Sequence, residues 1–256
     1  MNQSLTFEQP LHERVRLLLR LEALGARFGD ALASGGPFDH HEALAALVDI
    51  YALVTRVDIK RELMAEIERQ TANLNRLANL PGVDAERFDE TMAAQKRLHD
   101  ALEAQAGALD HRVRGSEFFS SLRQRMALPG GVFDFDLPIY HYWLEHPEST
   151  RRELLLEWFE PLNTVAEATT QVLHFMRQSG STEAVTAEGG YFQRTLDNTH
   201  AWQLIRVSVN TELGVYPEIS GGRQRFTVRF LMPGDFRERP VPAKHDVPFQ
   251  LCCCAL

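Results

Sequence analysis

The hydrophobic pattern of this chain changes its period once, near residue 180, and that change constrains the fold more than any other feature. From residue 11 to about residue 178, apolar residues recur at three- and four-residue steps, which is the spacing of amphipathic helices. After the polar run 178–182, apolar and polar residues alternate, which is the spacing of strands buried on one face. The sequence therefore predicts an α+β fold, with an N-terminal bundle of long helices followed by a small antiparallel β-sheet domain.

Turn and capping residues divide the first part into helices joined by short connections, as in a bundle. We expect helices over residues 39–56, 116–128 and 161–177, and a further helix that starts after Pro10. Two more helices should start at the caps Asp58 and Asp84. A capping box of Thr150 and Glu153 predicts the start of another helix at Thr150. The polar positions Glu66, Arg69, Gln70 and Asn73 are expected on a solvated face that could also meet a second copy of the chain.

The second part predicts an antiparallel sheet. We expect strands at 191–193, 204–209, 215–219 as an edge strand with Pro217, 223–230 and 247–253, with 180–190 as a linker. The alternating residues 5–7 are expected to join this sheet. We thus expect two domains. Residues 1–180 form a helical domain, apart from the first residues that join the sheet, and this domain forms the dimer. Residues 181–256 form a β-strand domain with a basic face.

The strand at 223–230 carries arginines on one face. Arg223, Arg225 and Arg229 point to the side opposite Phe226, Val228 and Phe230, because successive side chains of a strand alternate. Like charges about 7 Å apart repel one another unless water or an acidic partner covers them. The stripe is therefore either a solvated face or a binding surface for an acidic ligand.

The net charge of −8 argues against general nucleic-acid binding. The charge is uneven, because residues 1–185 hold 19 Lys+Arg and 28 Asp+Glu, a net of −9, whereas residues 186–256 hold 8 and 7, a net of +1. No apolar run approaches the roughly 20 residues of a membrane span, and the first residues do not resemble a signal peptide. We therefore expect a cytoplasmic protein that does not bind membranes.

Motifs that carry chemistry are weak in this sequence. It has no phosphate-binding glycine motif, no Gly-x-Ser-x-Gly elbow and no Cys-x-x-Cys pair, so we expect no enzyme, cofactor or metal. His40 and His41 indicate a solvated helix start rather than a metal site, and His141 a packed histidine rather than a base. Asp134 and Asp136 could pair on a strand or serve in a turn. Cys252, Cys253 and Cys254 are expected as reduced thiols on a terminal strand.

Several strings, taken in order, resemble the bacterial cell-division family ZapD over essentially the whole chain. They are Phe7-Glu8-Gln9-Pro10-Leu11-His12-Glu13, Leu80-Pro81-Gly82-Val83-Asp84, Arg123 to Gly131, Phe135-Asp136-Leu137-Pro138 with His141 and Trp143-Leu144, Tyr216 to Gly221, and Arg225 to Phe230. Each string alone is short, but their order and spacing are specific to that family.

The resemblance implies a non-enzymatic factor that binds FtsZ, the tubulin-like GTPase polymer of the division ring. Such factors are recruited to mid-cell by FtsZ, cross-link and bundle its protofilaments, promote ring assembly and lower its GTPase activity. The resemblance also implies a homodimer formed through the helical domain, and a charged pocket in or beside the β-domain for the C-terminal tail of FtsZ. The residues expected to form that pocket are Arg223, Arg225 and Arg229, with Arg20, Arg56, Arg123, Arg125 and His141 completing it.

The residues also allow other functions. The same arginine face could serve a general scaffold of division proteins or a module that binds other anionic partners, including nucleic acid. A hydrolase built on Asp134, Asp136 and His141 would need a cleft with perturbed acids, and no motif points to one.

Overall fold

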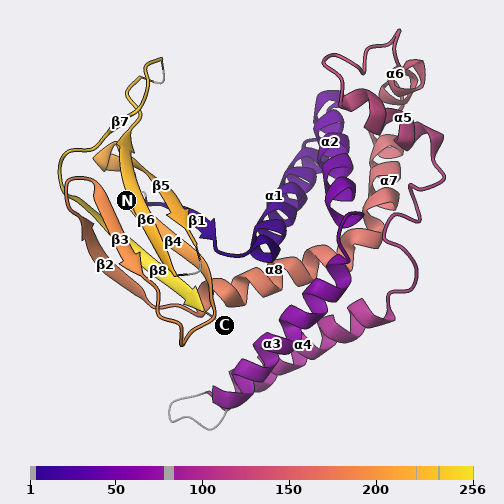
Figure 1. Ribbon diagram of the computed structural model, residues 1–256. Coiled ribbons are helices and arrows are strands. Elements are labelled where there is room, and N and C mark those ends of the chain that lie inside the picture. Colours follow the sequence, from indigo (N-terminus) through magenta and orange to yellow (C-terminus); the bar gives the residue numbers. More distant parts are fainter. Residues whose placement is uncertain (1–3, 78–83, 223, 236, 256) are drawn as a thin grey trace. The chain divides into compact units, whose positions relative to one another are not determined.

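The computed structural model describes residues 4–77, 84–222, 224–235 and 237–255. The fold is α+β, as predicted, and the chain divides into two compact units. A helical unit spans residues 17–172, and a β unit combines residues 1–16 with 173–256. In Figure 1 the indigo N-terminal strand accordingly lies among the orange and yellow strands of the C-terminal part.

The helices agree with the predicted pattern. They are α1 (Glu13–Ser34), α2 (Pro37–Val54), α3 (Ile59–Leu77), α4 (Ala85–Ala104), α5 (Glu117–Met126), α6 (Pro138–Leu144), α7 (Glu148–Phe159) and α8 (Asn163–Gln178), with a 3-10 turn at Glu160–Leu162. The two predicted caps Asp58 and Asp84 are confirmed, because each accepts a hydrogen bond from a backbone amide of the next turn. Ser116, where the helix over 116–128 was predicted to start, also caps its helix, since its hydroxyl accepts from the amide of Phe119. The start predicted at Thr150 is wrong, since α7 already begins at Glu148, directly after Pro147.

A buried polar network joins the long helices α3 and α4. The amide nitrogen of Gln70 donates to Glu66 Oε1 at 3.3 Å and to the carbonyl of Val172 at 3.1 Å, and Gln95 donates to Gln70 Oε1 at 3.1 Å. Glu66, Gln70 and Gln95 are fully buried. The prediction of a solvated face is therefore wrong for Glu66 and Gln70, because Gln95 of α4 and the α8 backbone cover that side of α3.

A second buried hub surrounds Arg151, whose guanidinium donates to four acceptors. Nε donates to His40 Nδ1 at 2.9 Å, Nη1 to the carbonyls of Leu144 and His146 at 2.7 and 2.6 Å, and Nη2 to that of Gly35 at 3.3 Å. His40 is fully buried, so the predicted solvated helix start is wrong there. Burial and then the charge of Arg151 lower the pKa of His40. The hub holds the start of α2 against the turn between α6 and α7.

The β unit contains two antiparallel sheets instead of the single one predicted. One has the strand order β1-β4-β8-β2 and the other β3-β6-β5, with β7 pairing with β6. The strands are β1 (Ser4–Pro10), β2 (Thr182–Ala187), β3 (Tyr191–Thr195), β4 (Trp202–Asn210), β5 (Tyr216–Gly221), β6 (Arg225–Met232), β7 (Val241–Pro242) and β8 (Val247–Ala255). The stretch expected as a linker contains β2, which pairs with β8 and forms an edge of the first sheet.

The two sheets enclose one apolar core. Phe226, Val228 and Phe230 of β6 are fully buried, together with inward residues of β4 and β8. The rings of Phe230 and Phe249 lie 5.2 Å apart across this core. Burial of one such side chain stabilises the fold by about 1.5–3 kcal/mol. Because this face of β6 is committed to the core, Arg225, Thr227 and Arg229 must face away from it.

An ion cluster links β1, β4 and the C-terminal turns of α8. Glu8 accepts bonds from Arg177 Nε and Nη2, both at 2.8 Å, and from Arg206 Nε at 2.9 Å. The Glu8 side chain is only 18% exposed. Burial alone would raise the pKa of Glu8, but the hydrogen bonds and charges of Arg177 and Arg206 outweigh it, so this pKa is lowered.

We expect Glu8→Gln to destabilise the protein by about 2–3 kcal/mol at pH 7, because it leaves two half-buried arginines without a carboxylate. The lowered pKa of Glu8 means that its ionised form is bound more tightly in the folded state. Its contribution is thus present above the ordinary value of 4.5 and is lost as the pH falls through the lowered folded value. Urea unfolding at pH 7 and pH 3 measures the difference in unfolding free energy between the wild type and Glu8→Gln. The same difference at both pH values would contradict the expectation.

We expect Arg151→Lys to destabilise the protein by about 2 kcal/mol, because an ammonium group cannot serve the four acceptors that the planar guanidinium reaches. Arg61→Lys, at an exposed position of α3, is the matched control and should change the free energy of unfolding by less than about 0.5 kcal/mol. Urea unfolding measures the free energy of unfolding of both variants. Equal values for the two would show that the hydrogen bonds of Arg151 do not stabilise the fold as expected.

Candidate binding face

The side of the β3-β6-β5 sheet that faces away from the core carries the predicted arginines, and we call it the outer face. Strand register arranges its residues in three rows. The rows, each read from β3 across β6 to β5 or, in the last row, to the residue after it, are Tyr191, Arg229 and Glu218; Gln193, Thr227 and Ser220; and Thr195, Arg225 and Gly222. The face thus combines two arginines, one glutamate and a neutral middle row.

Turn geometry brings β3 alongside β6. Gly190 has a φ of 77°, and a Cβ at this position would lie 2.4 Å from the carbonyl oxygen of Ala243. Only glycine fits there without a shift of the backbone. The carbonyl of Gly190 accepts a hydrogen bond from the amide of Phe230 at 2.8 Å, so β3 starts in register with β6.

A depression of about 660 Å³ lies on the outer face and has Arg225 in its wall. Its lining residues are Tyr191, Gln193, Ser220, Gly221, Gly222, Gln224, Arg225, Phe226 and Thr227. Gly222, which directly follows β5, lies opposite Arg225 and brings no side chain to that side of the arginine. Arg229 does not line the depression, although Tyr191 of the same row does, and on its other side Arg229 lies opposite Glu218.

Arg225 and Arg229 differ from Arg177, Arg194 and Arg206 of the same unit in having no ionic partner among the described residues. Arg194 pairs with Glu183 and lies over the ring of Phe192 at 5.3 Å. Arg225 and Arg229 are exposed, and neither has an ion pair within the part of the chain that the structure describes. Their charges are available to a ligand. Arg223, which was predicted to share this face, lies outside the described residues.

The other residues predicted for the pocket belong to the helical unit. They are Arg20 on α1, Arg56 after α2, Arg123 and Arg125 on α5, and His141 on α6. Arg125 Nη1 pairs with Asp136 Oδ1 at 3.2 Å. His141 is exposed, so the expectation of a packed histidine is wrong.

The acidic pair considered for catalysis does not form on a strand. Residues 132–136 form turns, where Asp134 accepts a hydrogen bond from the amide of Phe135 at 2.8 Å and Asp136 pairs with Arg125. The turn alternative for these carboxylates is therefore confirmed.

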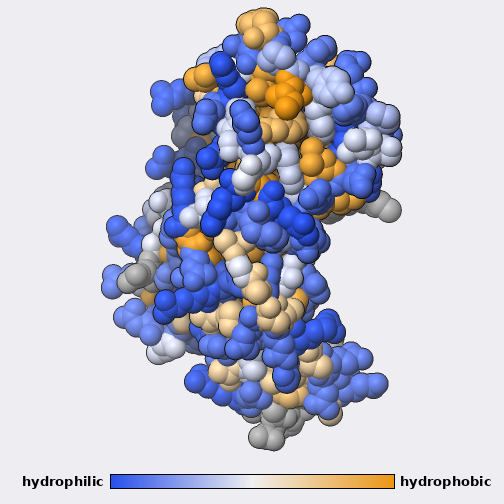
Figure 2. All heavy atoms as spheres, turned by 90° about the vertical axis from the view of Figure 1, so that its right-hand side faces the viewer, coloured by the Kyte–Doolittle hydropathy of each residue, from blue (hydrophilic) through white to orange (hydrophobic). Residues whose placement is uncertain are grey.

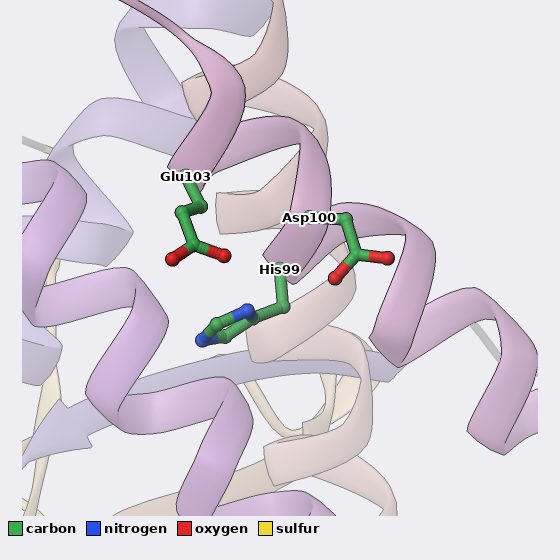
Figure 3. Close-up of side chains that lie close together, drawn as sticks. All are labelled: His99, Asp100 and Glu103. Carbon is green, nitrogen blue, oxygen red and sulfur yellow. The ribbon is translucent and has the colours of Figure 1, made fainter.

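A group of potential metal ligands lies on α4. His99, Asp100 and Glu103 place ligand atoms within 4.8 Å of one another, and Figure 3 shows all three projecting from the same helix. His99 Nε2 lies 3.1 Å from Glu68 Oε1, and Asp100 Oδ2 lies 2.7 Å from Lys96 Nζ. These ion pairs account for the positions of His99 and Asp100, and we assign no ligand to the group.

Comparisons with known proteins agree on one family. A family model described as "ZapD: Cell division protein" matches residues 19–229. The cell division protein ZapD of Methylococcus capsulatus is 38% identical over 256 residues and is covered completely, as is this chain. ZapD of Ralstonia nicotianae is 37% identical over 250 residues, which cover 97% of this chain and 98% of that protein. ZapD of Chromobacterium violaceum is 35% identical over 250 residues, which cover 98% of this chain and 99% of that protein. Among the described residues, the helices are too short or too polar to cross a membrane.

Proposed function

Because this chain belongs to the ZapD family of cell division proteins, we propose that it is a non-enzymatic division factor that binds the C-terminal tail of FtsZ. In this proposal it is cytoplasmic and reaches the mid-cell division site through FtsZ. There it cross-links and bundles FtsZ protofilaments, promotes assembly of the division ring and lowers FtsZ GTPase activity.

The observation that supports tail binding is the exposed guanidinium of Arg225 at the wall of the depression. A guanidinium can hold a carboxylate through two parallel hydrogen bonds, a geometry that a lysine cannot reproduce. The site is open to solvent, so each tail contact is weak and sensitive to salt. Arg229 extends the positive surface along β6, and Arg20, Arg56, Arg123, Arg125 and His141 are proposed as further contacts.

Weak single contacts can still bundle filaments when several of them form at once. A two-fold dimer presents two outer faces, and a polymer presents a tail on every subunit. Once one tail is bound, a neighbouring tail binds at a high effective concentration, so the summed affinity exceeds that of one contact. Bundled filaments exchange subunits less readily, and this would lower GTP turnover without any chemistry on the nucleotide.

Exposed apolar side chains support dimerisation through the helical unit. Figure 2 shows orange side chains gathered in the upper part of the view, over α5 and α6. The exposed large apolar residues between the end of α5 and the end of α6 are Leu128, Phe133, Phe135, Ile139 and Tyr142. The rings of Phe133 and Phe135 stack at 5.6 Å. Gathered apolar side chains of this kind are typical of surfaces that another protein covers.

We expect Arg225→Glu to reduce co-sedimentation with FtsZ filaments at least about tenfold, because it replaces the carboxylate-binding group by a repelling charge. Lys244→Glu makes the same charge change at an exposed position outside the lining of the depression and should pellet like the wild type. Neither the wild type nor Lys244→Glu should pellet with filaments that lack the C-terminal tail. Unchanged pelleting with tailless filaments would refute tail docking.

We expect the full chain to sediment as a dimer, with twice the 29.1 kDa of one chain, and Phe135→Ser to shift it toward the monomer. Phe135 is 78% exposed, so its replacement should leave the fold intact. Val57→Ser, which removes another exposed apolar side chain, is the control. Sedimentation equilibrium measures the masses, and a dimer that survives Phe135→Ser unchanged would place the interface elsewhere.

A further inference from the structure

The outer face is not uniformly basic, because Glu218 stands directly opposite Arg229 across the β5–β6 pair. Glu218 is exposed. Side chains in such cross-strand positions have Cβ atoms about 4.5–5.5 Å apart. Even so, no ion pair joins Glu218 to Arg229 within the described ranges, so both charged groups face solvent. The row of Tyr191, Arg229 and Glu218 therefore displays an aromatic ring, a positive charge and a negative charge side by side.

The two ends of the face differ in charge as a result. At the Arg225 end, the neighbours Thr195 and Gly222 bring no charge. The rows of Arg225 and Glu218 lie about 13 Å apart along the strand, given about 3.3 Å per residue. That distance exceeds the Debye length of about 8 Å at physiological salt, so Glu218 hardly affects a carboxylate bound at Arg225. A second negative charge arriving at Arg229 would, in contrast, meet Glu218 within one strand spacing.

The row between the two ends is neutral and hydrogen-bonding. Gln193, Thr227 and Ser220 offer amide and hydroxyl groups to a ligand that crosses the depression. These groups are suited to the backbone of an extended peptide, which presents amides and carbonyls but no charge. A continuous polyanion has no such neutral stretch.

From this arrangement we infer that the outer face selects a peptide of mixed charge. The peptide carries a carboxylate for Arg225 and, about four residues further along an extended chain, a basic side chain for Glu218. Glu218 is the specificity-determining residue, since it attracts the basic side chain and repels polyanions such as nucleic acid. This inference rests on the proposed function of the same face and specifies the chemistry of the tail segment that it binds.

The test compares the wild type, Glu218→Gln and the control Glu212→Gln, each as the full chain. Glu212 is exposed in the 3-10 turn before β5, where its carboxylate accepts a hydrogen bond from the side-chain amide of Asn210 at 3.3 Å. Two probes are used: a synthetic FtsZ C-terminal peptide, and the same peptide with its Lys and Arg residues changed to Gln. Fluorescence anisotropy gives the affinities, and a heparin column gives the salt concentration of elution.

Loss of the basic residues should weaken peptide binding to the wild type and to Glu212→Gln by about three- to tenfold. The same change in the peptide should alter binding to Glu218→Gln by less than about twofold, because the partner carboxylate is gone. Glu218→Gln should also elute from heparin at higher salt than the other two proteins. Together these results would establish Glu218 as the partner of the basic side chain and as the barrier to polyanions.

The outcomes separate this inference from the proposed function. If all three proteins bind the peptide and lose equal affinity with the substituted peptide, Glu218 has no role in selection, while tail binding stands. If none of the three proteins binds the peptide, the proposed function fails. The heparin column then tests by itself whether Glu218 repels polyanions. If the wild type and Glu218→Gln elute at the same salt concentration, the inference fails as well.

Discussion

The packing of one face of β6 into the core of the β unit is the interaction on which the binding face depends. Phe226, Val228 and Phe230 are fully buried between the sheets, so the alternate residues of β6 must face solvent. A slip of register by one residue would bury Arg225 and Arg229 and expose the three apolar side chains. The cost of burying unpaired guanidinium groups excludes that arrangement. The same contacts therefore stabilise the unit and orient its arginines.

The charged groups of two buried sites contrast with those of the outer face. In the buried sites, Glu8 has two arginine partners, and Arg151 has four acceptors. Such groups favour one geometry, because an unpaired charge in the same place would be strongly destabilising. On the outer face, Arg225 and Arg229 are exposed and unpaired within the described part of the chain, so they add little to stability. On that contrast we base the proposal that the outer face is a surface for recognition.

The sequence predicts those features that local pattern decides. Helix caps such as Asp58 and the outward direction of Arg225 follow from short-range chemistry, and both are found. The burial of His40 and Gln70 was not predicted, because it depends on Arg151 and Gln95, which come from distant segments. The two-sheet arrangement was missed for the same reason. Without the pairing of β5 with β6, nothing in the sequence places a glutamate opposite an arginine.

A weak, mixed-charge face would suit the proposed function, in which the partner is a polymer. An isolated strong site would hold one tail for long times and would not need a second copy. In that proposal, open arginines would give rapid, salt-sensitive contacts, and the avidity of a dimer on a filament would supply the stability that each contact lacks. Selectivity cannot come from the arginines alone, because any anion satisfies them. It must come from a group that penalises the wrong ligand, and on this face Glu218 is placed to do so.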